Sequence, residues 1–469
     1  MKSYNLAIIG AGPGGYVATI RAAKEGLRVA LVSGGDLGGT CLNRGCIPSK
    51  TMLKHAEVIE EIKGAKTYGI TVNDFSFSIK DMVSRKTKVV KTLQNGIKSL
   101  MKQNKIDVFD GMGTVKEDKT VTIASASGSE TIQADNVMLA NGSKPLVPGL
   151  PGIDEIDYYT SDTIFDIEEV PGHLVIMGGG VIGLEIACIF NSLDTEVEIV
   201  EMADRIIPTE DPDASDYLKR ELSKKGITFH TSAKITGFRK SGANAAVEVE
   251  AADGGKNTIE TDSVLVAVGR QPNLTGIEDL DVAFDGKFVK VNQNLQTSVP
   301  GIYAVGDLIG GFQLAHAASD EGIRAVTHMA GKDGKGSKAA AGSPAESIIP
   351  RCVYTFPEIA SVGMTEAQAK EKGYRVKTKR VDIAANGKAI AAGEKSGFMK
   401  LIAEEKYGEV LGVVMVGAHV TEMISQATSY MHLEGTVDEI DSMVFPHPTI
   451  SESMGEAGSA WLEKGIHYS

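Results

Sequence analysis

The stretch YNLAIIGAGPGGYVATIRAAKEGLRVALVS, residues 4–33, decides the fold of this chain. A short apolar run leads through a glycine-rich turn into an amphipathic run, and a second apolar run follows. This order is typical of a strand, a helix and a second parallel strand, the unit that binds dinucleotides. Gly10, Gly12 and Gly15 have the spacing that permits a tight turn, close approach of the backbone to a pyrophosphate, and close packing of helix on strand. We therefore predict a nucleotide site at this turn.

A second copy of the same pattern, HLVIMGGGVIGLEIACIFNSLDTEVEIVE, occupies residues 173–201. Its glycines are Gly178, Gly180 and Gly183, and Glu201 ends its second strand. A carboxylate at that position accepts hydrogen bonds from the ribose hydroxyls and repels a 2′-phosphate. The second site is therefore predicted to prefer NAD over NADP. The corresponding position of the first copy is Ser33, which offers a hydroxyl instead of a carboxylate.

Composition limits the class of protein. The chain has 469 residues, 53 of them glycine, and a net charge of −13, so we expect three or four domains and neither nucleic acid nor an anionic membrane surface as a partner. The first residues form an apolar strand without a leader pattern, and no apolar run approaches the length of a membrane span. A reducing cytosol is the expected location, which makes a close cysteine pair more typical of catalysis or metal binding than of structure.

Such a pair lies in GGTCLNRGCIPSK, residues 38–50, just after the first nucleotide-binding unit. Pro48 stands where the first turn of a helix tolerates it, and a helix N-terminus favours the thiolate of Cys46. We interpret Cys41 and Cys46 as a reactive pair. Zinc binding and a pair of inert buried thiols are the alternatives, but Cys188 and Cys352 lie far apart in the chain and form no second close pair, so no metal is expected.

The rest of the chain divides by composition. Alternation in TVTIAS, residues 120–125, predicts a small antiparallel insertion in the first unit. Residues 331–347 lack apolar periodicity and are predicted to be an exposed connection. Strand and helix patterns after it indicate a separate α+β unit. The predicted fold class is thus α/β, with two Rossmann-like dinucleotide-binding domains followed by an α+β domain.

Ordered motifs along the chain resemble those of the pyridine nucleotide-disulfide oxidoreductases, the flavoprotein disulfide reductases, and within them the dihydrolipoyl dehydrogenases. The motifs are GAGPGGY (10–16), GGTCLNRGCIPSK (38–50), GGGVIGLE (178–185), AVGRQPN (267–273), GIYAVGDL (301–308), LAHAASDEG (314–322) and FPHPTISE (445–452). The resemblance covers essentially the whole chain. It implies an FAD-binding domain (1–148), an NAD-binding domain (149–271), a central domain with linker (272–346) and a C-terminal dimerisation domain (347–469).

The resemblance also implies the catalytic residues. Cys46 would lie against the flavin as a charge-transfer thiolate, and Cys41 would exchange disulfides with the substrate. Lys50 would approach the flavin and pair with Glu185, since burial without a partner would be costly for either charge. His447 would be the catalytic base, oriented by Glu452, and would act on the disulfide of the partner subunit in a homodimer.

Further residues are implied to hold the cofactors. Those for tightly bound, non-covalent FAD are Gly10, Gly12, Gly15, Ser33, Gly39, Thr40, Lys50, Gly113, Asn141, Gly142, Asp307, Leu314, Ala315 and His316. Those for NAD are Gly178, Gly180, Gly183, Glu185, Glu201, Ile235 and Gly269. The chain departs from the pattern of the family at Ser33, where an acidic residue is usual, at Asn141, where Thr is common, and at Phe356, where His is common.

The implied activity is oxidation of protein-bound dihydrolipoamide to lipoamide with reduction of NAD⁺. The chain begins at the FAD fold, so the lipoyl group is expected on a partner, either the acyltransferase (E2) of a 2-oxoacid dehydrogenase complex or the H protein of glycine cleavage. Glutathione and mercuric reductases share the disulfide; Glu201 argues against NADP-linked members, and the C-terminus WLEKGIHYS lacks a cysteine pair. A soluble transhydrogenase or a nucleotide-binding scaffold would have no use for the cysteine pair.

Overall fold

The computed structural model describes residues 1–331, 348–394 and 396–468, and the chain forms two compact units. The first unit contains the described residues of Met1–Pro148, Tyr159–Val170 and Val266–Gly342. The second contains those of Gly149–Tyr158, Pro171–Leu265 and Ser343–Ser469. From residue 332 onward, the connection predicted at 331–347 lies outside the described residues.

A seven-stranded sheet in the order β3-β2-β1-β6-β5-β4, with β19 beside β6, forms the centre of the first unit. Its parallel strands are β1 (Lys2–Ile9), β2 (Val29–Ser33), β3 (Asp107–Asp110), β6 (Gly128–Leu139) and β19 (Ile302–Ala304). Strands β4 (Met112–Val115) and β5 (Thr120–Ser125) are antiparallel, which confirms the predicted insertion. Apolar side chains of β1 pack alternately into the cores on the two faces of the sheet, as expected of a buried parallel strand.

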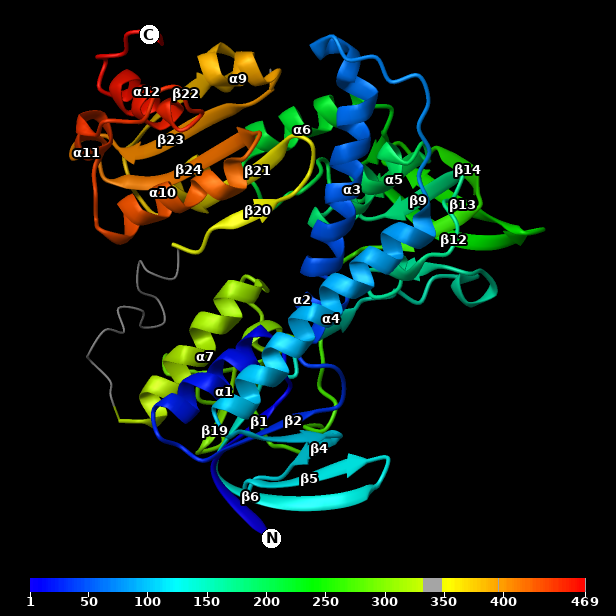
Figure 1. Ribbon diagram of the computed structural model, residues 1–469, viewed down its shortest axis with the longest axis vertical. Helices are drawn as coiled ribbons and strands as arrows, with labels where there is room; N and C mark the ends of the chain where they lie inside the picture. The colour runs from blue at the N-terminus through cyan, green and yellow to red at the C-terminus, as the bar shows by residue number, and fades with distance from the viewer. Residues whose placement is uncertain (332–347, 395, 469) are drawn as a thin grey trace. The chain divides into compact units, whose positions relative to one another are not determined.

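Helices α1 (Pro13–Lys24) and α7 (Ala315–Met329) lie side by side in the first unit (Figure 1). A Cβ at Gly322 would come within 2.6 Å of the Gly14 carbonyl oxygen, so their close packing requires glycine. The other helices are α2 (Gly39–Asn43), α3 (Cys46–Gly64) and α4 (Ile79–Gln103). Shorter elements are η1 (Ala65–Tyr68), β7 (Ser143–Pro145), β8 (Tyr159–Thr160), η3 (Ile164–Asp166), β16 (Arg270–Pro272), β17 (Phe284–Asp285), β18 (Phe288–Val289) and η4 (Gly306–Ile309).

The second unit begins with another strand–helix–strand fold. Its sheet has the order β11-β10-β9-β15, from β9 (His173–Met177), β10 (Glu196–Glu201), β11 (Thr228–Thr231) and β15 (Ser263–Val266). Helices α5 (Val181–Ser192) and α6 (Pro212–Lys224) and the turn η2 (Ile153–Glu155) accompany it. An antiparallel sheet follows, from β12 (Ala233–Ser241), β13 (Asn244–Ala251) and β14 (Lys256–Thr261).

The C-terminal part of the second unit is an antiparallel sheet in the order β20-β21-β24-β23-β22, with helices packed on it. Its strands are β20 (Arg351–Val353), β21 (Glu358–Gly363), β22 (Val376–Asp382), β23 (Phe398–Glu404) and β24 (Val410–Gly417). Its helices are α8 (Glu366–Glu371), η6 (Ile383–Ala385), α9 (Gly387–Ala392), α10 (Val420–His432), α11 (Val437–Ser442) and α12 (Glu452–Trp461). Trp461 is buried in this core, and its indole N–H donates to the Lys377 carbonyl.

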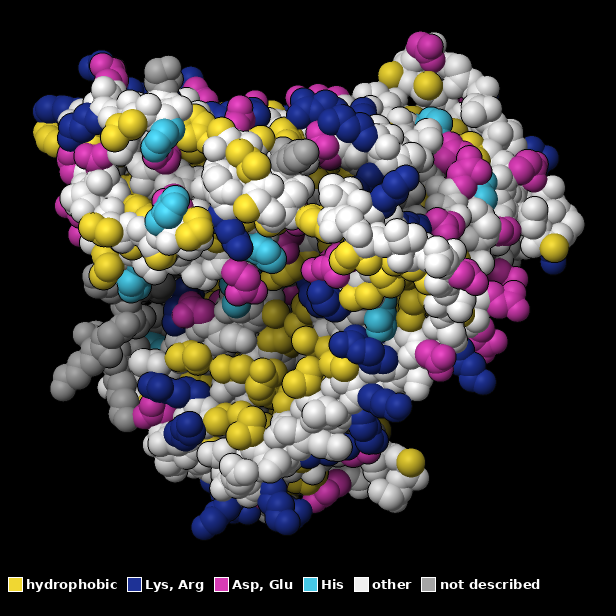
Figure 2. All heavy atoms as spheres, turned by 45° about the horizontal axis from the view of Figure 1, so that its top comes forward, with side chains coloured by type: hydrophobic (Ala, Val, Ile, Leu, Met, Phe, Trp, Pro, Cys, Tyr) yellow, Lys and Arg dark blue, Asp and Glu magenta, His cyan; other side chains and the backbone are white. Residues whose placement is uncertain are grey.

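This topology confirms the predicted fold class, with two dinucleotide-binding folds and a C-terminal α+β part. The division into four domains with the boundaries given above stays a prediction. Among the described residues, none of the helices is both long and apolar enough to span a membrane. On the face shown in Figure 2, both acidic and basic side chains are exposed.

Candidate active site

The three glycines of the first fingerprint each have a separate structural reason. Gly10 has φ +104°, which side-chain-bearing residues rarely adopt. A Cβ at Gly15 would lie 1.9 Å from the Gly10 carbonyl oxygen, so helix α1 can approach β1 only with glycine there. A Cβ at Gly12 would meet no atom within 4 Å, so this glycine leaves open space in front of the N-terminus of α1. Helix α1 therefore offers its first N–H groups and positive dipole end to a phosphate.

The second fingerprint repeats this geometry. Gly178 has φ +109°, and a Cβ at Gly183 would lie 2.2 Å from the Gly178 carbonyl oxygen. Gly180, like Gly12, has open space where a Cβ would be. The Glu201 carboxylate stands beside this turn at the end of β10 and accepts from the backbone N–H groups of Gly179 at 2.6 Å and Ala203 at 2.7 Å. The two turns are thus built to receive two dinucleotides, with the acidic group only at the second.

At the first turn, Ser33 stands where the family usually has an acidic residue, and its hydroxyl makes a local hydrogen bond. The Ser33 hydroxyl donates to the Gly35 carbonyl at 2.7 Å and stabilises the bend after β2. Nearby, the side chain of Asn141 donates to the Thr275 carbonyl at 2.9 Å, while its Oδ1 is buried without a hydrogen-bond partner among the described residues. A buried acceptor of this kind fits a polar ligand. The open turn and the free acceptor therefore fit FAD.

The cysteine segment is fixed directly to this turn. The N–H of Gly38 donates to the Ala11 carbonyl at 2.8 Å, and Gly38 has φ +99°. A Cβ at Gly39 would lie 2.5 Å from the Cα of Gly12. Helix α2, which carries Cys41, is therefore held against the first fingerprint by backbone contacts that only glycine permits.

The two thiols are in contact and differ in their electrostatics. A hydrogen bond to Cys46 raises the pKa of Cys41 well above its usual range; burial raises it further, and Lys50 opposes both effects. Cys46 is the first residue of the 19-residue helix α3, whose N-terminus favours a thiolate. The negative charge of the reduced pair is therefore expected on Cys46, which agrees with the role predicted for it.

Two residues that the sequence analysis missed hold this segment in place. The Asn43 side-chain amide donates to the Gly39 carbonyl at 2.8 Å and to the Leu37 carbonyl at 3.2 Å. Gln94, which is buried in α4, donates to Asn43 Oδ1 at 2.7 Å. Asn43 lies within the quoted motif and could have been noticed. Gln94 lies 51 residues further along, and no local pattern connects the two.

Asp307 is also positioned by a distant network. Its carboxylate accepts from the hydroxyl of Ser143, which in turn accepts from Arg270 Nε at 2.7 Å. Arg270 Nη2 donates to the Ser143 carbonyl at 2.9 Å, and Nη1 lies 3.3 Å from a carboxylate oxygen of Asp162. Three residues of this network were not among the predicted site residues, namely Ser143, Arg270 and Asp162. Each is of a polar type that is common on protein surfaces, so its type alone does not indicate a site.

Glu321 is a half-buried carboxylate near Asp307. It accepts from the Gly306 N–H at 2.7 Å, and burial raises its pKa to about 7, with Asp320 and Asp307 contributing in the same direction. An acid whose pKa is higher in the folded than in the unfolded protein destabilises the fold as it ionises. Stability is therefore lost as the pH rises from the ordinary Glu range to about 7.

We expect Glu321→Gln to remove this dependence, because the amide oxygen still accepts from Gly306 but carries no charge. Tm of the holoenzyme, measured between pH 5 and 8, should rise in the variant relative to the wild type as the pH increases. Glu130→Gln is the matched control, since the Glu130 side chain is 50% exposed and does not contribute to the shift in the pKa of Glu321, and it should show no such trend. An equal Tm difference at both ends of the pH range would contradict the assignment.

The remaining candidate, His447, lies in the C-terminal part of the second unit. Its Nδ1 is 2.9 Å from Glu452 Oε1, and Glu452 Oε2 accepts from the Thr449 N–H at 2.9 Å. These hydrogen bonds, the backbone one first, lower the pKa of Glu452. Glu452 thus stays a carboxylate and orients the imidazole. The His447 side chain is 79% exposed in the single chain, so its other nitrogen is available to a substrate or a partner subunit.

Comparison with known proteins shows which family this chain belongs to. Residues 4–322 match the pyridine nucleotide-disulphide oxidoreductase family, and residues 349–458 match its dimerisation domain. The chain belongs to this family. Members use FAD and NAD, which confirms both predicted cofactors and the prediction of an NAD-dependent flavoprotein disulfide oxidoreductase. The dimerisation domain supports the predicted homodimer.

Curated relatives within the family extend over the full length. Two proteins of Bacillus subtilis (strain 168) named dihydrolipoyl dehydrogenase are 40% and 41% identical, covering 99% and 98% of this chain and 99% of each relative. One from Chlamydia muridarum with the same name is 36% identical over 99% of this chain and 98% of its own. These relatives confirm the resemblance on which the motif assignments rest.

Two solved structures are similar to this chain over nearly its whole length. The Cu(II) complex of the HOCl-induced flavoprotein disulfide reductase RclA from Escherichia coli has a TM-score of 0.86 at 28% identity, covering 98% of this chain and 100% of that one. LpdA from Mycobacterium tuberculosis has a TM-score of 0.88 at 25% identity, covering 98% and 99%.

The other predicted residues lie on several elements of the two units. Lys50 is on α3, and Glu185 is buried on α5, where one of its carboxylate oxygens accepts from the Tyr354 N–H at 3.2 Å. These two residues belong to different units, so their pairing stays a prediction. The rest are Thr40 on α2, Gly113 on β4, Gly142 with φ +70°, Ile235 buried on β12, Gly269 with φ +114°, Leu314 at the N-cap of α7, and Ala315 and His316 in its first turn.

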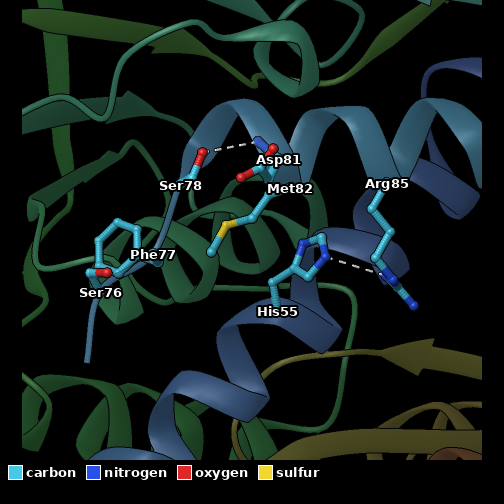
Figure 3. A pocket seen from close by; sticks show the side chains of 7 residues that line it. All are labelled: His55, Ser76, Phe77, Ser78, Asp81, Met82 and Arg85. Carbon is cyan, nitrogen blue, oxygen red and sulfur yellow. Dashed lines mark hydrogen bonds between the residues drawn. The ribbon is translucent and has the colours of Figure 1, made fainter. Parts of the chain in front are cut away.

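A separate cavity of about 450 Å³ lies in the first unit and contains none of the predicted site residues (Figure 3). It is lined by His55 on α3, by Ser76, Phe77 and Ser78 before α4, and by Asp81, Met82 and Arg85 on α4. Burial, followed by the charge of Arg85, lowers the pKa of His55.

Proposed function

We propose that this chain is a dihydrolipoyl dehydrogenase, which oxidises dihydrolipoamide on a partner protein to lipoamide and reduces NAD⁺. The contact of Cys41 and Cys46 beside the first fingerprint carries the proposal, because it places a dithiol against the turn that fits FAD. The names of the relatives that match over full length indicate the substrate.

The residues act in this order. His447, held by Glu452, takes the proton of one substrate thiol, and the resulting thiolate attacks Cys41 and breaks the Cys41–Cys46 disulfide. Cys46 leaves as a thiolate, which the N-terminus of α3 stabilises. The second substrate thiol attacks the mixed disulfide, its proton passes to the departing sulfur of Cys41, and the cyclic disulfide is released while Cys41 is left as a thiol. FAD, when bound, carries the electron pair from the dithiol to NAD⁺.

The remaining predictions belong to this proposal. The histidine of one subunit serves the disulfide of the other, which suits the exposure of His447 and of its neighbour Val444, 91% exposed in the single chain. Lys50 and Glu185 form an ion pair near the flavin. The lipoyl group arrives on an E2 acyltransferase or a glycine cleavage H protein, the location is the cytoplasm, and the four-domain division given above holds.

A substrate panel tests the function. The purified yellow protein is assayed with dihydrolipoamide, glutathione disulfide and mercuric ion, each with the NAD and the NADP couple. We expect efficient turnover of dihydrolipoamide with NAD⁺. Turnover of glutathione disulfide or mercuric ion at a higher kcat/KM would contradict the proposal, as would a preference for NADP.

Cofactor choice gives a separate prediction. Glu201→Gln keeps one acceptor oxygen for the backbone N–H groups of Gly179 and Ala203 and removes the charge that repels a 2′-phosphate. We expect the NAD-to-NADP ratio of kcat/KM to fall by about tenfold to a hundredfold, the size of one hydrogen bond to a charged group. Glu250→Gln, on the neighbouring sheet, should leave the ratio unchanged. An unaltered ratio in the Glu201 variant would remove this residue from the specificity argument.

A further inference from the structure

A group of metal-ligating side chains lies on three neighbouring strands of the second unit, outside the site described above. His173 is the first residue of β9, Glu198 is in β10, and His230 is in β11. Glu196 is the residue of β10 that pairs with His173, and it lies on the same face of the strand as Glu198. The strands therefore bring together two imidazoles and two carboxylates that are distant or unpatterned in the sequence.

Glu198 lies between the two histidines. One of its oxygens is 3.2 Å from His173 Nε2, and the other is 2.6 Å from His230 Nε2. Ligand atoms of His173, Glu196 and Glu198 all lie within 4.8 Å of one another. The side chains of His173 and Glu198 are only 19% and 17% exposed, so bulk water is largely excluded from the space between them.

The orientation of His173 shows which nitrogen is available. Its Nδ1 lies 2.9 Å from the Glu260 carbonyl oxygen at the end of β14. A carbonyl only accepts, so Nδ1 carries a proton, and Nε2 is the ring nitrogen that can coordinate a metal ion when it carries none. Nε2 is buried and makes no hydrogen bond with the described residues, since its contact with Glu198 lacks hydrogen-bond direction. Metal-binding histidines typically donate their second N–H to a carbonyl in this way.

We propose that His173, Glu196 and Glu198 bind one Zn²⁺ ion, and that His230, hydrogen-bonded to Glu198, holds this carboxylate in place behind the metal. One imidazole nitrogen and two carboxylate oxygens leave a fourth position of a tetrahedral zinc site to water, and the imidazole suits Zn²⁺ better than Mg²⁺ or Ca²⁺, which prefer oxygen ligands alone. No metal was expected from the sequence, where zinc binding was weighed on the cysteines alone. The three ligands and His230 come from three strands, and no spacing motif connects them.

The zinc site is separate from the cofactor site. Glu201, at the NAD fingerprint, is three residues beyond Glu198 on β10, roughly 10 Å along the strand and on the opposite face. A metal ion here would join β9 and β10, and through the hydrogen bond of His230 to Glu198 also β11, at the end of the sheet away from the dinucleotide. Its expected effect is on the stability of this sheet rather than on electron transfer.

Equilibrium dialysis against Zn²⁺, followed by elemental analysis, tests the proposal on FAD-loaded protein without a histidine tag. A Cys41→Ser/Cys46→Ser background removes the dithiol, which would itself bind Zn²⁺. We expect one Zn²⁺ per chain in this background. His173→Ala, Glu198→Gln and His230→Ala should each weaken binding by more than about tenfold, since even residues behind the ligands contribute that much. Zn²⁺ should raise Tm in the background protein but not in these variants.

Glu260→Gln is the matched control, because only its backbone carbonyl contacts His173, and it should bind Zn²⁺ like the background. Variants that retain FAD and elute like the background protein are scored as folded. The proposal would be overturned if the background protein bound no zinc. It would also be overturned if those of the three variants that are folded bound zinc as tightly as the background protein does. Because the catalytic cysteines are absent from every sample, these outcomes are independent of the dehydrogenase activity.

Discussion

Replacement of Cys46 by serine is expected to lower the turnover of dihydrolipoamide with NAD⁺ by more than about a thousandfold, as for other essential nucleophiles. Serine cannot form the disulfide, and its hydroxyl does not ionise near neutral pH at the N-terminus of α3. The disulfide route is then closed, although both nucleotide folds remain intact. The measurement is the steady-state rate of NADH formation.

The control for this variant is NADH oxidation with ferricyanide as the acceptor, which needs both nucleotide sites but no disulfide. We expect that rate to be retained. Cys188→Ser is the matched cysteine variant, because Cys188 is buried in α5 far along the chain from the pair, and it should preserve dihydrolipoamide turnover. Normal dihydrolipoamide oxidation by the Cys46 variant would refute the proposed mechanism.

Replacement of His447 by glutamine is expected to reduce kcat for dihydrolipoamide by about 10²- to 10⁴-fold, the usual contribution of a general base. Glu452→Gln should have a smaller effect, because the base is still present but less firmly oriented. The pKa of Glu452 is lowered, so the wild-type carboxylate persists as the pH falls through the ordinary Glu range. Above that range, the acidic limb of the pH–kcat profile should therefore report on the imidazole and should be lost in the His447 variant.

His432→Gln, at the last turn of α10 in the same unit, is the matched histidine control and should leave kcat and the pH profile unchanged. Substrates that are already thiolates at the assay pH should lose less activity in the His447 variant, because they need no base. An equal loss for thiol and thiolate substrates would indicate a structural rather than a proton-transfer role.

The sequence predicted those parts of the site that depend on local pattern. The glycine spacing of both fingerprints, the cysteine pair at a helix start, and Glu201 at a strand end follow from backbone geometry within about 30 residues. The structure adds contacts between segments that are distant in the chain. The support of Asp307 by Ser143 and Arg270, and of Asn43 by Gln94, joins residues more than fifty positions apart. Such contacts depend on tertiary packing, and single residues carry no local signal for them.

The cluster around His173 also shows that contacts between distant segments are not apparent from the sequence. His173 and Glu201 both lie within the quoted second fingerprint, yet only Glu201 stood out there, because it occupies a position with a known chemical purpose. His173 gains its meaning from Glu198 and His230, which the parallel pairing of β9, β10 and β11 brings beside it. Strand register, which the sequence did not specify, decides which side chains become neighbours.

The contact between Gly39 and the Cα of Gly12 has a consequence for how this protein tolerates change. One added methyl group at Gly39 would press on the phosphate-binding turn and at the same time displace the helix that carries Cys41. A substitution at Gly39 should therefore impair flavin retention and thiol chemistry together. In any mutational scan, losses of the two properties at this position should rise and fall together, and selection on either property constrains the other.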